Sequence, residues 1–166
     1  MLEFAPDKLT VEMLYIFLAV SLVRLTFWIL FANTIRKTLN LIAKENRNIL
    51  PNQAWFVAVP LFNIYWHFEV ARRLCDSLNN EFYDRKIAVE ENPTLKEGRI
   101  YAWTYLAINV PFPPFLLVIG GILNLIYFIT YWVKINQYHN LLKEHNKFRD
   151  NTVNTVESLP TEEQDQ

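Results

Sequence analysis

The sequence predicts an all-α fold: a small helical integral membrane protein with three or four membrane spans. The segment Ile100–Val133 runs for thirty-four residues without one Asp, Glu, Lys or Arg. Because about twenty helical residues cross a bilayer core about 30 Å thick, this segment is too long for one span. Apolar residues make up 52% of the chain, yet its mean hydropathy is only +0.06, so apolar blocks alternate with charged ones. The net charge is −1. This charge balance gives no support to nucleic-acid binding.

The first apolar segment, residues 13–32, is expected to be a retained span and not a cleaved signal peptide. It follows the acidic residues Glu3, Asp7 and Glu12. It is also longer than the apolar core of a signal peptide, which has about 7–15 residues. Apolar side chains continue beyond it at helical spacing and predict an amphipathic extension outside the membrane. These side chains are Ile35, Leu39 and Ile42.

The second apolar segment, residues 54–70, is short for a span and is broken in its middle by Pro60 and Asn63. Two alternatives follow: the segment crosses the membrane fully, or it enters and returns at Pro60–Asn63. An amphipathic helix is expected after it, because large apolar side chains recur at every fourth residue. They are Leu74, Leu78 and Phe82.

The third and fourth segments, residues 100–111 and 114–133, are expected to form a helical hairpin. Three prolines between them remove backbone donors and predict a turn at Phe112–Phe115. The hairpin would bring Arg99 and Lys134 to the same end. We expect residues 1–148 to form one membrane domain, in which the last helix leaves the bilayer as an amphipathic rod. Residues 149–166 are rich in acids and poor in large apolar groups, so they are expected to form a disordered acidic tail.

The positions of Lys and Arg predict the orientation of the chain. One basic residue precedes the first span; four follow it in the first connecting segment, six lie in the second, and four in the C-terminal part. If segment 54–70 returns, fourteen basic residues face the cytoplasm against one outside, with the N-terminus outside. If the segment crosses, eleven basic residues lie on one side of the membrane and four on the other. The count favours the return, although a re-entrant backbone must be buried in protein or line a cavity.

Seven residues in or beside the apolar segments are the candidates for a polar intramembrane cluster. They are Arg24, Pro60, Asn63, His67, Glu69, Asn109 and Asn124. A mid-bilayer Arg costs about 2.5–3.5 kcal/mol, so Arg24 should face other helices and find a partner in Glu69 or in carbonyls near Pro60. It would then be a structural arginine or, alternatively, an anion or headgroup site.

The other polar candidates are expected to have structural roles more than catalytic ones. An asparagine in lipid normally makes an interhelical hydrogen bond. His67 and Glu69 are two positions apart, so they do not share a helix face and form no metal pair alone. No metal motif is present in the sequence. We therefore assign no catalytic, metal or cofactor-binding residue, and we expect no cofactor.

The second apolar segment and the helix after it carry a family resemblance. Trp55, Val59-Pro60 and Asn63, followed by Val70-Ala-Arg-Arg-Leu, resemble a motif of uncharacterised bacterial multi-pass membrane proteins (the DUF4328-like proteins). In that group a tryptophan precedes a Val-Pro-x-x-Asn break and an amphipathic helix follows. The resemblance covers about thirty residues and lacks the arginine-rich first loop of the group. It implies a bacterial inner-membrane location and no mechanism.

These observations favour a non-enzymatic function. We expect a membrane interaction or accessory subunit whose partners are the lipid bilayer and other membrane proteins or a second copy of itself. The alternative is a small transporter or channel component, with a polar site at broken helices. An intramembrane enzyme ranks third because paired catalytic groups are missing from the sequence. A transporter should bring Arg24, Asn63 and Glu69 to one wet cavity, whereas an accessory subunit should keep them dry and mutually satisfied.

Overall fold

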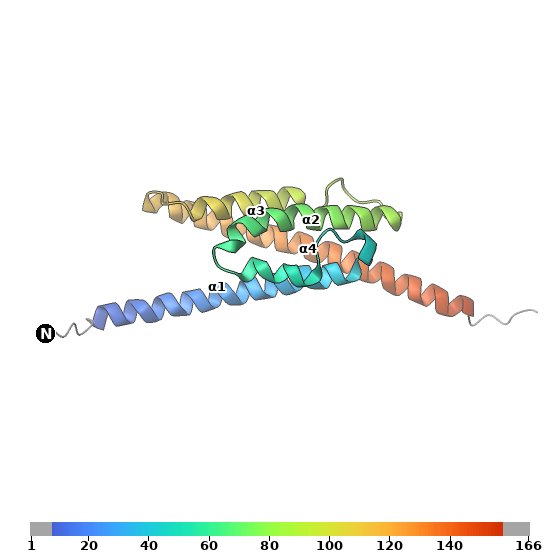
Figure 1. The fold of residues 1–166 in the computed structure, drawn as a ribbon, viewed down its shortest axis with the longest axis horizontal. Helices are drawn as coiled ribbons and strands as arrows, with labels where there is room; N and C mark the ends of the chain where they lie inside the picture. The colour runs from blue at the N-terminus through green and yellow to red at the C-terminus, as the bar shows by residue number, and fades with distance from the viewer. Residues whose placement is uncertain (1–7, 158–166) are drawn as a thin grey trace, which may run out of the picture.

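The computed structural model describes residues 8–157 and builds them almost entirely from helix (Figure 1). Four α-helices and two short 3-10 helices follow one another, with no strand among residues 8–157. They are α1 (Lys8–Leu41), η1 (Lys44–Asn46), η2 (Pro51–Ala58), α2 (Phe62–Asp84), α3 (Leu95–Ile108) and α4 (Pro114–Glu157). The all-α prediction is confirmed.

Helix α1 joins the first apolar segment and its expected extension into one continuous helix. The extension buries one face: Ile35 and Leu39 are 0% exposed, and Ile42 is 1% exposed. That face packs against η2 and α4. The predicted periodicity is therefore confirmed, and its apolar stripe is buried inside the protein.

The chain reverses its direction between η2 and α2, at residues 59–61. The backbone N–H of Phe62 donates to the carbonyl of Pro60 at 2.8 Å, and Leu61 takes a positive φ of 65°. The rings of Phe56 and Phe62, on either side of the turn, lie 5.5 Å apart. Segment 54–70 is therefore two helices folded back on each other, which favours the re-entrant alternative over one continuous crossing. The reason is local: Pro60 lacks the N–H that would continue the first helix.

Helices α3 and α4 form the predicted antiparallel hairpin. The turn occupies residues 109–113, slightly earlier than expected, and α4 begins at Pro114, a favourable first helical residue. A Cβ built on Gly98 would lie 2.9 Å from the Tyr131 ring, and one on Gly120 would lie 3.1 Å from Ile108. These contacts place the two arms side by side with opposite directions. Arg99 and Lys134 therefore lie at the same end of the hairpin, as predicted.

Helix α4 continues further than the sequence suggested. It reaches Glu157, so the part of the expected disordered tail from residue 149 to 157 is helical. Adding residues to an existing helix avoids the unfavourable nucleation step, and the next proline is Pro160. The rest of the expected tail, residues 158–166, lies outside the described residues.

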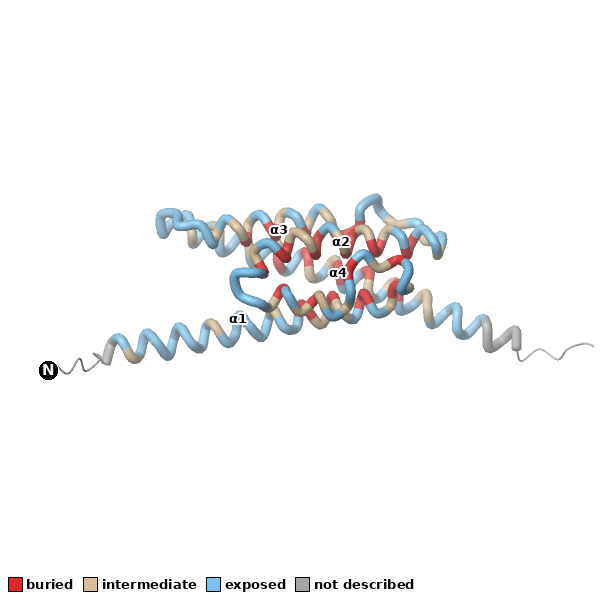
Figure 2. Tube along the Cα trace, in the orientation of Figure 1, coloured by how far each residue is buried: buried red, intermediate tan, exposed pale blue. Residues whose placement is uncertain are grey.

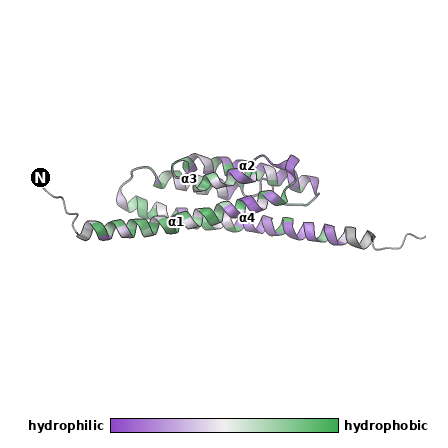
Figure 3. Cartoon of the chain, turned by 60° about the horizontal axis from the view of Figure 1, so that its bottom comes forward, coloured by the Kyte–Doolittle hydropathy of each residue, from purple (hydrophilic) through white to green (hydrophobic). Residues whose placement is uncertain are grey.

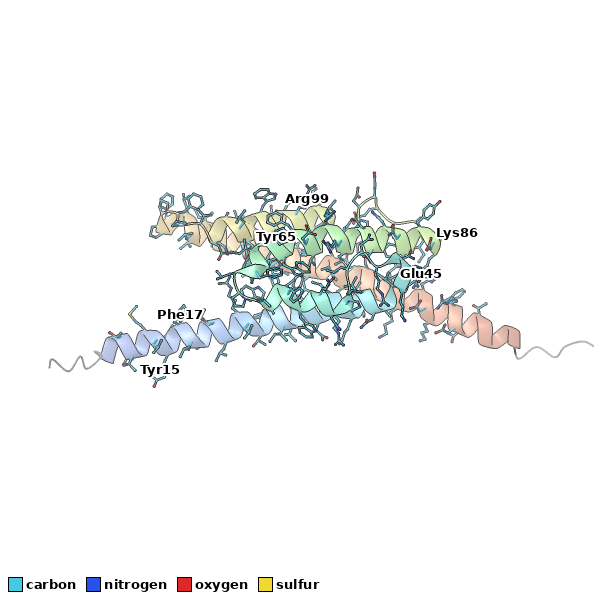
Figure 4. All side chains as sticks on the ribbon, in the orientation of Figure 1. Tyr15, Phe17, Glu45, Tyr65, Lys86 and Arg99 are labelled. Carbon is cyan, nitrogen blue, oxygen red and sulfur yellow. The ribbon has the colours of Figure 1, made fainter. Side chains whose placement is uncertain are left out.

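The molecule has an apolar end and a polar end. Large apolar side chains on the first half of α1 and on α4 up to Val133 are exposed, whereas the buried core lies toward the other end (Figures 2 and 3). Tyr15 and Phe17 mark the apolar end and Glu45 and Lys86 the polar end (Figure 4). The segments Thr10–Leu41 and Pro114–Thr152 are long and apolar enough to cross a membrane.

A network of buried polar groups fixes the polar end, and we call it the polar joint: Asn46, Glu81, Arg85 and Asn146. The Glu81 carboxylate accepts hydrogen bonds from the backbone N–H of Ala43 and from Asn46 Nδ2, both at 2.9 Å. Arg85 pairs with Glu81 and donates to Asn146 Oδ1 at 2.6 Å. The joint thus ties η1 and the end of α2 to the C-terminal half of α4.

Candidate functional site

The Arg24 side chain reaches from α1 toward α3. Its Nη2 donates a hydrogen bond to the Tyr105 hydroxyl at 3.0 Å. Its guanidinium carbon lies 4.4 Å from the centre of the Trp28 ring, one helical turn further along α1, and 5.6 Å from that of Tyr105. These aromatic faces attract the cation. Arg24 therefore faces another helix, as predicted, but its partners are aromatic residues.

Glu69 and the carbonyls near Pro60 are not the partners of Arg24, so that prediction is wrong. Glu69 accepts from Arg73 Nε at 2.6 Å and from Arg72 Nη2 at 3.1 Å, both on its own helix. Tyr65 Oη donates to its other oxygen at 3.0 Å. Spacings of three and four residues place these groups on one face of α2. Arg72 and Arg73 on the same helix therefore neutralise Glu69, in place of a cation on another helix.

His67 is buried in the core, at 2% exposure, between α2 and α3. Its Nε2 lies 3.2 Å from the Tyr101 hydroxyl. The centres of the Tyr101 and Tyr105 rings lie 4.7 and 4.8 Å from that of His67. The histidine is thus held by two aromatic rings of α3, separate from Glu69 in its contacts.

The three asparagines differ in how their amides are satisfied. Asn124 Nδ2 on α4 donates to Thr104 Oγ1 on α3 at 3.1 Å, the expected interhelical bond. Asn109 Nδ2 donates to the backbone carbonyl of Tyr105 at 2.7 Å within the same helix end. Asn63 is fully buried, and neither atom of its amide has a hydrogen-bond partner among the described residues.

Tyr101 and Tyr105 are site residues that the sequence reasoning missed. Both are nearly fully buried, at 1% and 3% exposure, and they lie one turn apart on the inner face of α3. Tyr105 is the residue that contacts both Arg24 and His67. The sequence feature that could have identified them is a pair of tyrosines at helical spacing in a segment without charges. Each buried hydroxyl there needs a polar partner.

A lateral groove of about 420 Å³ lies between α1 and the α3–α4 hairpin. It forms because α1 diverges from the hairpin toward the apolar end (Figure 1). Its walls are mostly apolar, and Arg24 and Asn124 supply the polar side chains that are not aromatic. The other residues that line it are Val20, Val23, Phe27, Trp28, Tyr101, Tyr105, Ile108, Gly121, Leu125, Phe128, Ile129 and Trp132. Among the residues that the structure describes, no carboxylate lines this groove.

The groups that could carry chemistry are thus divided between places. Arg24, Tyr105, Tyr101 and His67 form a chain of contacts from the groove into the core, while Glu69 lies on another face. Within residues 8–157, no group of three His, Cys, Asp or Glu side chains is arranged to hold a metal ion. The arrangement offers a cation and hydrogen-bond donors at the wall of an apolar groove.

The sequence matches no protein-family model and no curated protein, and the fold matches no solved structure. The described residues form an all-helical structure with two helices long and apolar enough to cross a membrane. The resemblance to uncharacterised bacterial membrane proteins stays a prediction.

Proposed function

We propose that the protein is a three-span protein of the bacterial inner membrane. In this arrangement α1, α3 and α4 cross the bilayer, and the turn between η2 and α2 enters it and returns. The support is that exposed apolar side chains cover the first half of α1 and the first half of α4, a surface that water would disfavour. The Lys and Arg residues other than Lys8 and Arg24 lie outside these apolar stretches, toward the other end, which would face the cytoplasm.

Within that membrane, we propose that the protein acts as a non-enzymatic interaction or accessory subunit. The observation that carries this proposal is the open lateral groove, with the charged side chain of Arg24 in its wall. An exposed cation at mid-bilayer depth costs about 2.5–3.5 kcal/mol. A partner that fills the groove would remove this cost, so the isolated chain has a reason to associate.

A small transporter or channel component is the second candidate. The reversed helix pair at Pro60 and the unpartnered amide of Asn63 favour it, because transporters build their binding sites at broken helices. However, Glu69 is held on the outer face of α2 by Arg72 and Arg73. The three groups expected to meet in one cavity are therefore divided, which counts against the transporter. They are not mutually satisfied either, as we expected for an accessory subunit, so the accessory proposal rests on the open groove.

Site-specific photo-crosslinking in intact cell membranes tests the accessory function. A benzophenone amino acid replaces Phe27, which lines the groove, or Tyr15, which is 67% exposed outside it. We expect the groove position to give one discrete protein adduct and the control position to give lipid adducts only. A groove position that gives only lipid adducts contradicts the proposal. Uptake of solute by vesicles that hold the purified chain alone would favour the transporter.

A further inference from the structure

Arg24 is a cation without a counter-charge. It makes no ion pair with any residue among 8–157, and its only hydrogen bond within this range is the one to the neutral Tyr105 hydroxyl. The guanidinium group carries five N–H donors, so most of them remain available. The side chain is exposed and lies in the wall of the groove. A group that carries negative charge and can enter the groove would complete this site.

The lateral groove suits the face of a helix. It lies between α1 and the α3–α4 hairpin, and its walls are apolar over most of their extent. Gly121 lies in one wall, and a Cβ built there would meet nothing within 4 Å, so a second backbone can approach closely. Small residues of this kind are typical where transmembrane helices pack together. Asn124 offers a second polar side chain in the same groove.

We infer that the groove docks a transmembrane helix of another membrane protein, one that presents an Asp or Glu to Arg24 at mid-bilayer depth. This inference rests on the proposed membrane function and names its partner. The carboxylate would pair with the guanidinium in a medium of low dielectric, where both charges are unfavourable alone and attract strongly together. Arg and carboxylate groups can form two parallel hydrogen bonds, which adds geometric selectivity.

A second copy of this chain does not fit the site. A copy in the same orientation would bring Arg24 to Arg24, and like charges repel. The nearest acid along α1 is Glu12, twelve residues away, or about 18 Å along the helix axis. An anionic lipid fits less well than a helix, because its headgroup belongs at the membrane surface. The lipid nevertheless shares the anionic chemistry, so the experiment must separate the two.

The test uses synthetic transmembrane peptides of Leu and Ala that carry one central Glu or, as a matched control, one central Gln. Binding to the full chain in phosphatidylcholine vesicles is measured by energy transfer between labels. We expect the Glu peptide to bind about tenfold more tightly than the Gln peptide. Arg24→Gln should abolish this preference, and Arg24→Lys should keep most of it. Gly121→Phe should weaken both peptides because it fills the groove while Arg24 is intact.

Tyr105→Phe tests how far the hydrogen bond between Arg24 and the Tyr105 hydroxyl contributes to binding. It removes the hydroxyl that positions Arg24 and keeps the cation, so the preference for the Glu peptide should be reduced but not abolished. If Arg24→Gln does not fold, the comparison of wild type with Gly121→Phe and Arg24→Lys decides the matter. Equal binding of the two peptides to the wild type overturns the inference, as does a preference that survives Arg24→Gln.

Vesicles that contain phosphatidylglycerol separate the lipid from the helix. If this lipid abolishes the preference for the Glu peptide and is retained by the wild type but not by Arg24→Gln in native mass spectrometry, the site binds lipid and the inference is wrong. The charge pair can fail in this test while the proposed accessory function still holds. A protein crosslinked from the groove that has no acid at mid-bilayer depth would keep the accessory function and overturn the charge pair.

Discussion

The indole Nε1 of Trp66 donates a hydrogen bond to the backbone carbonyl of Gln53 at 3.0 Å. Thirteen residues separate the two, and the turn at residues 59–61 lies between them. The bond therefore ties α2 back to η2 and fixes the reversal of the second apolar segment. It also gives a partner to a carbonyl that would otherwise be costly to bury, which is the condition for an irregular backbone inside a membrane.

Replacement of this indole should destabilise the fold. Trp66→Phe keeps an aromatic ring beside Phe56 and Phe62 but removes the donor to Gln53. We expect a loss of about 1–3 kcal/mol of unfolding free energy, since the carbonyl loses its partner. Equilibrium unfolding in mixed micelles measures it. The matched control is Trp103→Phe, because Trp103 is 61% exposed; a similar loss in both variants would contradict the role of the hydrogen bond.

Close packing of three helices at Gly98 predicts a second effect. A Cβ at this position would lie 2.8 Å from Ala71 Cβ and 2.9 Å from the Tyr131 ring. Gly98→Ala should therefore destabilise the protein by about 1–3 kcal/mol, the usual cost of overpacking. Gly121→Ala meets nothing within 4 Å and should be neutral or stabilising by up to about 1 kcal/mol. Equal effects of the two substitutions in the same unfolding assay would show that the hairpin packs differently.

The polar joint should make the free energy of unfolding depend on pH. Burial raises the pKa of Glu81, but hydrogen bonds from Asn46 and Ala43 and the contact with Arg85 outweigh it, so the pKa lies below its ordinary value of 4.5. A carboxyl whose pKa is lowered by folding stabilises the protein fully above the unfolded pKa, and this contribution is lost as pH falls through the folded pKa. Unfolding free energy should therefore decrease as pH falls below about 4.5.

Glu81→Gln tests whether Glu81 causes this pH dependence of stability. At neutral pH it should cost about 3–5 kcal/mol, because Arg85 is left buried beside a neutral amide. The acid limb of the stability profile should also become shallower. The control Glu91→Gln changes an exposed carboxylate and should stay within about 0.5 kcal/mol of the wild type. A Glu81→Gln profile that parallels the wild type at all pH values would rule out this explanation.

The unpartnered amide of Asn63 predicts a substitution that improves stability. Its two polar side-chain atoms are buried without a hydrogen bond among the described residues, which is unfavourable. Asn63→Leu has a similar volume and no polar atom, so the unfolding free energy should stay equal or rise by about 1 kcal/mol. A loss above about 1 kcal/mol would mean that the amide binds a polar partner in the membrane, as a transporter site would require.

The sequence was sufficient for the helical segments and for the hairpin turn, whereas at Pro60 it showed a break and left open whether the chain crosses or returns. Prolines have a local effect, so Pro60 and the prolines at 111–114 could be read as breaks without knowledge of the packing. The apolar stripe of Ile35, Leu39 and Ile42 was equally clear, because its spacing matches a helix. The end of α4 was missed, since composition alone does not show that an existing helix can continue.

The side-chain partners could not be predicted in the same way. Glu69 was the expected partner of Arg24 because it is the nearest opposite charge on another apolar segment, yet Arg73 lies one turn away on its own helix and binds it. The actual partner, Tyr105, depends on which face of α3 meets α1. Periodicity does not define this face in a segment that is apolar on all sides.

We propose that the apolar end of the molecule lies in a bilayer and that all connections at the polar end lie on one side of it. Cysteine labelling in oriented membrane vesicles tests this most directly, in a Cys75→Ser background with single cysteines at positions 12, 47, 96 and 112. We expect cysteines at 47 and 96 to react with an impermeant maleimide from the cytoplasmic side and those at 12 and 112 to react from the opposite side. Cysteines at 47 and 96 that react from opposite sides, or all four from the same side, would contradict it.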